Sequence, residues 1–275
     1  MFGILYLVGT PIGNLGDLSQ RAMETLQAVD FIAAEDTRVT IKLLNHFGIK
    51  KPLISYFAHN RRERGEEILS RLLAGESCAL VSDAGMPAIS DPGEELVALC
   101  AEREIEIICI PGPSAFVTAL ALSGLPTDRF TFEGFLSGVG KARREHLNTL
   151  KHEPRTMVFY EAPHKLLHTL EDMLAVLGDR RVALCRELTK KFEETVRTTL
   201  SEAIVRYTAE KPRGEFVLVI EGAPDTAAET VSLADALVML RTRTESGISL
   251  KDAVREISEV SGIPKNRLYA EAIKD

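Results

Sequence analysis

The chain has 275 residues and a mass of 30.3 kDa. At roughly 100–200 residues per domain, this length predicts about two domains and a small appendage. Hydrophobic residues make up 45% of the sequence and charged residues 27%, so a disordered chain is excluded and an ordinary buried core is expected. The formal net charge of −7 argues against a protein that coats nucleic acid by bulk attraction, although local basic clusters can still hold phosphates.

Signals for membrane insertion and secretion are missing from the sequence. Apolar stretches such as Phe116 to Leu122 fall far short of the roughly 18–20 residues of a membrane helix, and Met1-Phe2-Gly3 leads into an apolar run without a basic region. We therefore expect a cytoplasmic protein without a membrane partner. The cysteines lie singly in apolar surroundings without metal-ligand spacing, which predicts buried thiols and no metal site. They are Cys78, Cys100, Cys109 and Cys185.

From Ile4 to Pro113, short apolar runs alternate with amphipathic stretches. This alternation predicts parallel strands with covering helices, and we assign residues 1–113 to an N-terminal α/β domain. The predicted strands are Leu5–Val8, Phe31–Ala34, Leu53–Tyr56, Cys78–Val81 and Glu106–Ile110.

A second alternating series predicts another α/β domain, residues 114–224. It opens with a helix of small residues over Ser114–Leu122. The predicted strands are Arg129–Phe135, Thr156–Tyr160, Arg181–Cys185 and Phe216–Ile220, and the predicted helices are Gly140–Leu150, His164–Leu177 and Ser201–Ala209.

The last part of the chain, residues 225–275, is predicted to be a helical extension that follows a small, polar linker over Gly222–Thr226. Two of its helices, Ser249–Ile257 and Lys265–Ile273, are spaced as in a helix-turn-helix. Between Ser232 and Asp275, seven Lys and Arg balance seven Asp and Glu. Since DNA-binding modules are usually basic, we expect a contact to RNA or the ribosome, or a role in a dimer, and no DNA partner.

Three loops rich in small residues follow strands of the first predicted sheet. Gly9–Asp17 has glycines spaced as in neither a dinucleotide fingerprint nor a phosphate loop, so an ordinary turn is an open alternative there. Ser82–Gly93 combines carboxylates, small residues and prolines in a stiff loop that a ligand can approach closely. Pro111–Ala115 ends the next strand in the same way. Because parallel strands end at one sheet edge, the three loops predict a cofactor cleft.

Other polar segments leave two interpretations open. Ala34–Arg38 combines two carboxylates with a guanidinium, which fits either a functional group or a structural ion pair with a helix cap. His59–Arg62 and the basic segment Lys141–Arg144, which we expect to be a mobile loop, fit either phosphate contacts or solvated surface. Glu161–His164 and Arg186–Lys191 end strands of the second domain.

Several of these segments resemble the ribosomal RNA small subunit methyltransferase I family of the tetrapyrrole methylase superfamily, from Leu5 to the final helix. They are Gly9–Leu15, Ala34–Arg38, Ser82–Pro87, Gly134-Phe135, Phe159–Glu161, Arg186–Lys190, Gly214–Leu218 and Pro264–Tyr269. Tetrapyrrole-type enzymes usually carry Gly-Asp-Pro at Ser82–Pro87 and Gly-x-Gly-Asp at Gly13–Asp17. Both departures point to the RNA branch.

The resemblance implies a two-domain tetrapyrrole-methylase-like α/β fold with an S-adenosylmethionine cleft between the domains. It also implies a homodimer that methylates the 2′-hydroxyl of a cytidine in the decoding region of 16S ribosomal RNA, without a metal. Two alternatives stay open. One is a methyltransferase acting on a tetrapyrrole or a protein side chain, and the other is a non-catalytic ribosome-binding factor.

Placement after strands, reinforced by the resemblance, supplies the candidate site residues. The expected cofactor-binding residues are Thr10, Pro11, Ser82, Asp83, Ala84, Gly85, Met86, Ser114, Ala115, Tyr160, Leu188 and Glu215. The catalytic candidates are Asp36, His59, Glu187 and Lys190, and those for RNA are Arg38, Arg61, Lys141 and Arg143. Lys190 fits either a base neutralised by burial or a cation beside a developing alkoxide, and the sequence does not choose.

Overall fold

The structure is a computed structural model that describes residues 2–138, 140–224 and 232–273. The chain divides into two compact units, Met1–Gly222 and Ala223–Asp275. A boundary near residue 113 within the first unit stays a prediction. Residues 225 and 226 of the predicted linker lie outside the described residues. Within the described ranges, no helix combines the length and apolar character needed to cross a bilayer.

The first sheet of the larger unit is parallel throughout, with strand order β3-β2-β4-β1-β5. Its strands are β1 (Leu5–Val8), β2 (Phe31–Ala34), β3 (Leu53–Ser55), β4 (Cys78–Val81) and β5 (Ile107–Ile110). Every residue of β2 and β4 is buried, because helices cover both faces of a parallel sheet. The loops that follow these strands therefore meet at one edge.

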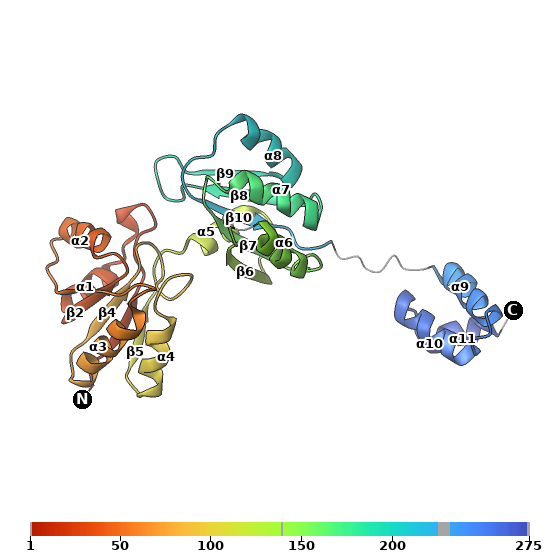
Figure 1. Ribbon diagram of the computed structural model, residues 1–275, viewed down its shortest axis with the longest axis horizontal. Coiled ribbons are helices and arrows are strands. Elements are labelled where there is room, and N and C mark those ends of the chain that lie inside the picture. The colour runs from red at the N-terminus through yellow and green to blue at the C-terminus, as the bar shows by residue number, and fades with distance from the viewer. Residues whose placement is uncertain (1, 139, 225–231, 274–275) are drawn as a thin grey trace. The chain divides into compact units, whose positions relative to one another are not determined.

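Two helices cover each face of this sheet (Figure 1). On one face, α1 (Gln20–Ala28) and α2 (Thr37–His46) pack against the sheet through Leu26 and Leu44. On the other face, α3 (Arg61–Leu73) and α4 (Glu94–Glu102) do so through residues such as Ile68 and Leu96.

The second sheet is mostly antiparallel, with strand order β6-β7-β10-β8-β9. Only β6 and β7 pair in parallel. Its strands are β6 (Phe130–Phe135), β7 (Thr156–Glu161), β8 (Arg181–Arg186), β9 (Glu194–Thr199) and β10 (Phe216–Ile220). The edge strand β9 is absent from our sequence prediction because its residues, Glu-Thr-Val-Arg-Thr-Thr, contain no apolar run.

Helices also cover both faces of the second sheet. One face carries α6 (Gly140–Thr149), α7 (Leu166–Leu177) and α8 (Leu200–Ala209). The other carries α5 (Ala115–Ser123), which lies in the chain between the two sheets and packs on the apolar residues of β7, β8 and β10. The start of α5 therefore lies where the loops of the first sheet meet the second sheet.

The smaller unit contains α9 (Leu233–Glu245), α10 (Leu250–Ser261) and α11 (Lys265–Ala272) around a core of its own. Leu240, Val254 and Leu268 lie in that core. The last two helices are joined by a short turn in which Gly262 adopts a φ of 70°, a conformation that glycine accepts at low cost.

Three of the four cysteines are buried, and Cys109 is exposed. The prediction of a buried thiol at Cys109 is therefore wrong. The physical reason is that Cys109 lies on β5, an edge strand of the first sheet that is only partly covered.

Candidate active site

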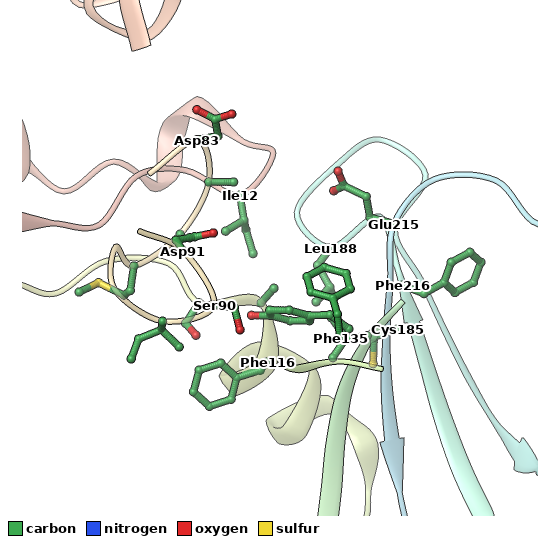
Figure 2. Close-up of a pocket in the computed structure, with 18 of the residues that line it drawn as sticks. Ile12, Asp83, Ser90, Asp91, Phe116, Phe135, Cys185, Leu188, Glu215 and Phe216 are labelled. Carbon is green, nitrogen blue, oxygen red and sulfur yellow. The ribbon is translucent and has the colours of Figure 1, made fainter. Parts of the chain in front are cut away.

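A cavity of about 320 Å³ lies between the loops at the carboxyl edge of the first sheet and one end of the second sheet (Figure 2). On the first side, it is lined by the loop that follows β4 and the start of α5. On the second side, it is lined by the ends of β6 and β7, the loop after β8 and the start of β10. A cavity of this size, with both apolar and polar residues in its walls, suits a small-molecule ligand.

The loops that follow β1 and β4 are held together by backbone hydrogen bonds. The Thr10 N–H donates to the Gly85 carbonyl at 2.8 Å, and the Gly85 N–H donates to the Thr10 carbonyl at 3.1 Å. The buried Thr10 hydroxyl donates to the Ser82 carbonyl at 3.1 Å. Gly85 has a φ of 88°, which a residue with a Cβ adopts only under strain.

The loops that follow β1 and β5 are in direct backbone contact. A Cβ added to Gly9 would lie 2.7 Å from the Cα of Gly112 and 2.7 Å from the sulfur of Met86, which lines the cavity. This spacing is shorter than ordinary contacts allow, so glycine at this position is a steric requirement of the loop arrangement.

Three carboxyl groups, those of Glu35, Asp83 and Asp91, line the first side of the cavity. Burial raises the pKa of each, and repulsion among neighbouring carboxylates adds to the effect. The pKa of Asp91 rises to about 6. Within the described part of the chain, none of the three forms an ion pair with a basic side chain. This side of the cavity therefore presents negative charge, which the Arg38 guanidinium offsets in part at Asp83.

Asp36 has a structural partner. Its carboxylate accepts a hydrogen bond from the Arg38 N–H at 2.8 Å, capping α2, and forms an ion pair with the Arg38 guanidinium at 2.6 Å. The hydrogen bond from the Arg38 side chain lowers the pKa of Asp36 to about 2. Of the two interpretations open for this segment, the ion pair with a helix cap is present in the structure. Neither Asp36 nor the exposed His59 lines the cavity.

Lys190 lies in the opposite wall within a small charge network. Its ammonium donates to Glu187 Oε1 at 3.0 Å and to Glu215 Oε2 at 2.8 Å. Burial alone would lower the pKa of Lys190, but the hydrogen bonds to Glu215 and Glu187 outweigh it and leave the pKa above its usual value. The Lys190 side chain also packs on Gly13, since an added Cβ there would overlap Lys190 Cγ. Lys190 is therefore a fixed cation at the cavity.

Nine of the twelve residues expected to bind the cofactor line this cavity, although their binding role stays a prediction. They are Asp83, Ala84, Gly85, Met86, Ser114, Ala115, Tyr160, Leu188 and Glu215. Thr10, Pro11 and Ser82 do not line it. Among the four catalytic candidates, Lys190 lines the cavity, and Asp36, His59 and Glu187 do not.

The basic residues expected to contact RNA differ in exposure. The side chains of Arg38 and Lys141 are 86% and 84% exposed, and that of Arg61 is half exposed beside Glu95. Arg143 is instead buried and pairs with Asp172 at 2.6 Å. The expected mobile loop at Lys141–Arg144 is wrong, because these residues form the first turn of α6 and turn Arg143 inward. Its guanidinium is therefore unavailable to a phosphate.

The site prediction omitted Glu35, Asp91 and Phe135, which all line the cavity. For Asp91, the available signal was a repeated Ser-Asp pair, since Ser90-Asp91 repeats Ser82-Asp83 within one loop. For Phe135, the signal was the spacing of phenylalanines along the sequence. Phe132 follows Phe130 by two residues, as the period of a strand requires, but Phe135 follows Phe132 by three. Among the side chains that the structure places, no group of three or more His, Cys, Asp or Glu could hold a metal ion.

Comparison with known proteins supplies relatives that match over almost the full chain. The model of the tetrapyrrole (corrin/porphyrin) methylases matches residues 4–204. Ribosomal RNA small subunit methyltransferase I from Synechocystis sp. is 52% identical, over 97% of this chain and 96% of that protein. The protein of the same name from Escherichia coli O157:H7 is 47% identical, over 99% of this chain and 95% of that protein.

Solved structures share the fold at low sequence identity. A cobalt precorrin-4 methyltransferase superposes with a TM-score of 0.60 at 18% identity, covering 79% of this chain and 94% of that chain. A diphthine synthase superposes with a TM-score of 0.58 at 16% identity, covering 80% of this chain and 90% of that chain. These likenesses show the fold of the two sheets alone.

Proposed function

The chain belongs to the ribosomal RNA small subunit methyltransferase I family, and from this premise we propose that it methylates the 2′-hydroxyl of a cytidine in the decoding region of 16S ribosomal RNA. S-adenosylmethionine is the methyl donor in this proposal. The observation that carries the acceptor is similarity to RNA methyltransferases along the whole chain, at 43–52% identity for the relatives compared. The cytoplasm, where ribosomes are made, is the compartment in which this activity is expected.

The cavity has the chemistry that S-adenosylmethionine requires. The donor carries positive charge on its sulfonium and its amino group, and Glu35, Asp83 and Asp91 supply carboxyl groups that form no ion pair among the described residues. Its adenosine needs flat apolar surfaces, which Leu188 and Tyr160 provide in the opposite wall. These residues would hold the donor, and its sulfonium supplies a methyl group already activated for transfer.

The residues of the chain then have two tasks, which are to orient the acceptor hydroxyl and to stabilise the charge that develops on its oxygen. Orientation alone lowers the activation free energy by roughly 7–11 kcal/mol in favourable cases. We assign charge stabilisation to Lys190, because Glu187 and Glu215 keep its ammonium protonated and in place. Of the two roles open for Lys190, this assignment favours the cation over the base, and the proton of the acceptor hydroxyl passes to solvent water.

The proposed function is tested by methyl transfer to purified small ribosomal subunits that lack the modification. The protein is incubated with these subunits and labelled S-adenosylmethionine. The RNA is then digested, and its nucleosides are analysed by mass spectrometry. We expect label on the ribose of one cytidine. A precorrin and total soluble protein, incubated in parallel, serve as alternative acceptors.

Label on a base, on the precorrin or on a protein would overturn the proposed acceptor. Absence of donor binding, together with absence of transfer to any acceptor, would favour the ribosome-binding factor. The homodimer implied by the family stays a prediction, and sedimentation velocity of the full chain tests it.

The basic residues are expected to divide into surface contacts and structural groups. Replacing the exposed Lys141 with alanine should weaken RNA binding and flatten the slope of log K against log salt by about one unit or less. Arg143→Ala in the same turn should instead lower the free energy of unfolding by about 3 kcal/mol, because it removes a buried partner of Asp172. Salt-dependent binding and urea denaturation measure the two effects. A stability loss only in Lys141→Ala would contradict the division.

The affinity for S-adenosylmethionine is expected to rise with pH. Burial raises the pKa of Asp91 to about 6, and the positively charged donor favours the ionised carboxylate. Affinity should therefore increase about tenfold between pH 5 and pH 7, following the ionised fraction, and then level off. Calorimetry measures this profile, with uncharged-sulfur S-adenosylhomocysteine as the ligand control and Asp91→Asn as the protein control. Asp91→Asn should flatten the profile, whereas S-adenosylhomocysteine, which keeps its charged amino group, should show a smaller rise than the donor. An affinity that falls as pH rises would refute the assignment.

A further inference from the structure

A bulge in β6 determines where the side chain of Phe135 lies. Along β6, Phe132 stacks on Phe116 of α5, with ring centroids 4.5 Å apart. The next residue, Glu133, faces α6, where its Oε2 lies 3.1 Å from His146 Nε2. Strict alternation would place Phe135 on the α6 face with Glu133. The pairing with β7 instead shifts between Phe132 and Gly134. As a result, Phe135 returns to the face that carries Phe132.

The bulge brings Phe135 next to Tyr160 at the cavity. These two residues are direct partners in the β6–β7 pairing, and their ring centroids are 5.3 Å apart with an interplanar angle of 55°. Gly134 supports the bulge with a φ of 62°, and a Cβ there would lie 3.4 Å from the hydroxyl oxygen of Ser90 in the opposite wall. Ser90 itself has a φ of 63°. Backbone strain of this kind is concentrated at functional sites.

Phe135 is also the most exposed of the large hydrophobic residues that line the cavity, at 62%, compared with 46% for Ile89. Figure 2 shows its ring on the side of the second sheet, facing the loop that carries Ser90 and Asp91. An exposed ring at the rim is accessible to a group that arrives on a large molecule from solvent.

We propose that Phe135 is the surface on which the pyrimidine ring of the acceptor nucleotide stacks, a role that rests on the proposed RNA methylation. Proteins recognise unpaired RNA bases by stacking them on aromatic side chains. An enzyme that acts on one nucleotide of a structured RNA must also compensate for the stacking that this nucleotide loses. Phe135 supplies this compensation beside the cavity, and Tyr160 supports its ring from the neighbouring strand.

The test compares Phe135→Ala, Phe135→Trp and Phe2→Ala in the full-length protein. Phe2 is a matched control, since it is 51% exposed and precedes β1, at the sheet edge opposite the cavity. Single-turnover methylation gives the concentration of unmodified subunits needed for half-maximal rate, and calorimetry gives the dissociation constant for S-adenosylmethionine. Thermal unfolding confirms that each variant is folded.

Phe135→Ala should raise the half-saturating subunit concentration by about 5- to 150-fold, the range that one stacked base contributes. The donor dissociation constant should stay within twofold, Phe135→Trp should retain most of the affinity for subunits, and Phe2→Ala should match the unaltered protein. A donor affinity that falls with subunit affinity unchanged would assign the ring to the cofactor and overturn the proposal, as would an unchanged Phe135→Ala. If the unaltered protein methylates no RNA, the proposed function fails and the stacking role fails with it.

Discussion

Replacing Lys190 with methionine is expected to lower the rate constant of methyl transfer by about 10²–10³-fold at saturating subunits and donor. The ammonium is the cation that Glu187 and Glu215 fix at the cavity, at 3.0 and 2.8 Å. Methionine keeps an unbranched side chain as far as Cε, and with it the packing on Gly13, but removes the charge that stabilises a developing alkoxide. Single-turnover kinetics measure the effect on the chemical step separately from binding.

Lys191→Met is the matched control, because it removes the same charge from the next residue, which does not line the cavity. Its rate constant should stay within about twofold of the unaltered protein. The loss in Lys190→Met should also persist at high pH. A Lys190→Met rate within a few-fold of the unaltered protein would exclude charge stabilisation by this residue and leave orientation as the main contribution.

Replacing Gly9 with alanine is expected to lower methyl transfer by about 10²-fold, because displacing a site by about 1 Å has effects of that size. The added Cβ would lie 2.7 Å from the backbone of Gly112, so the loops after β1 and β5 must separate. Thr10, the next residue, carries this movement to Gly85 through their paired backbone hydrogen bonds. Calorimetry should show weakened donor binding, and overpacking should cost about 1–3 kcal/mol of stability.

Gly65→Ala is the control for Gly9→Ala. Gly65 lies inside α3, and a Cβ there would have its nearest neighbours at 3.8 and 3.9 Å, so alanine fits and activity should be unchanged. Equal activity and donor affinity in both glycine variants would show that the contact between the β1 and β5 loops does not position the site.

The first sheet could be predicted from the sequence because burial on both faces leaves a simple pattern. The residues of β2 and β4 are all apolar, and such runs between helices indicate a parallel sheet. The strand order of the second sheet could not be predicted. A helix connects β7 to β8, which suggests neighbouring parallel strands, yet β10 from much later in the chain lies between them and pairs antiparallel with both. Neither apolar runs nor helix periods encode that insertion.

The cavity could be predicted in part because the first sheet is parallel. Loops after parallel strands must meet at one edge, so position in the chain, reinforced by the family resemblance, pointed to Asp83 and Ser114, which line the cavity. Asp91 and Phe135 depend on backbone geometry that propensities do not specify. Ser90, with its positive φ, directly precedes Asp91, and the β6 bulge reverses the face on which Phe135 lies. Both are local departures from regular structure at the site itself.

The exposed edge of the first sheet has a consequence for thiol chemistry. Burial raises the pKa of Cys78 to about 12 and that of Cys100 to about 11, and burial also raises the pKa of Cys185, so these thiols form reactive thiolate poorly. Cys109 on β5 is open to solvent. A maleimide dye added in limiting amount therefore labels the native protein at one known position on the first sheet. Fluorescence from this position can follow donor binding without any substitution in the chain.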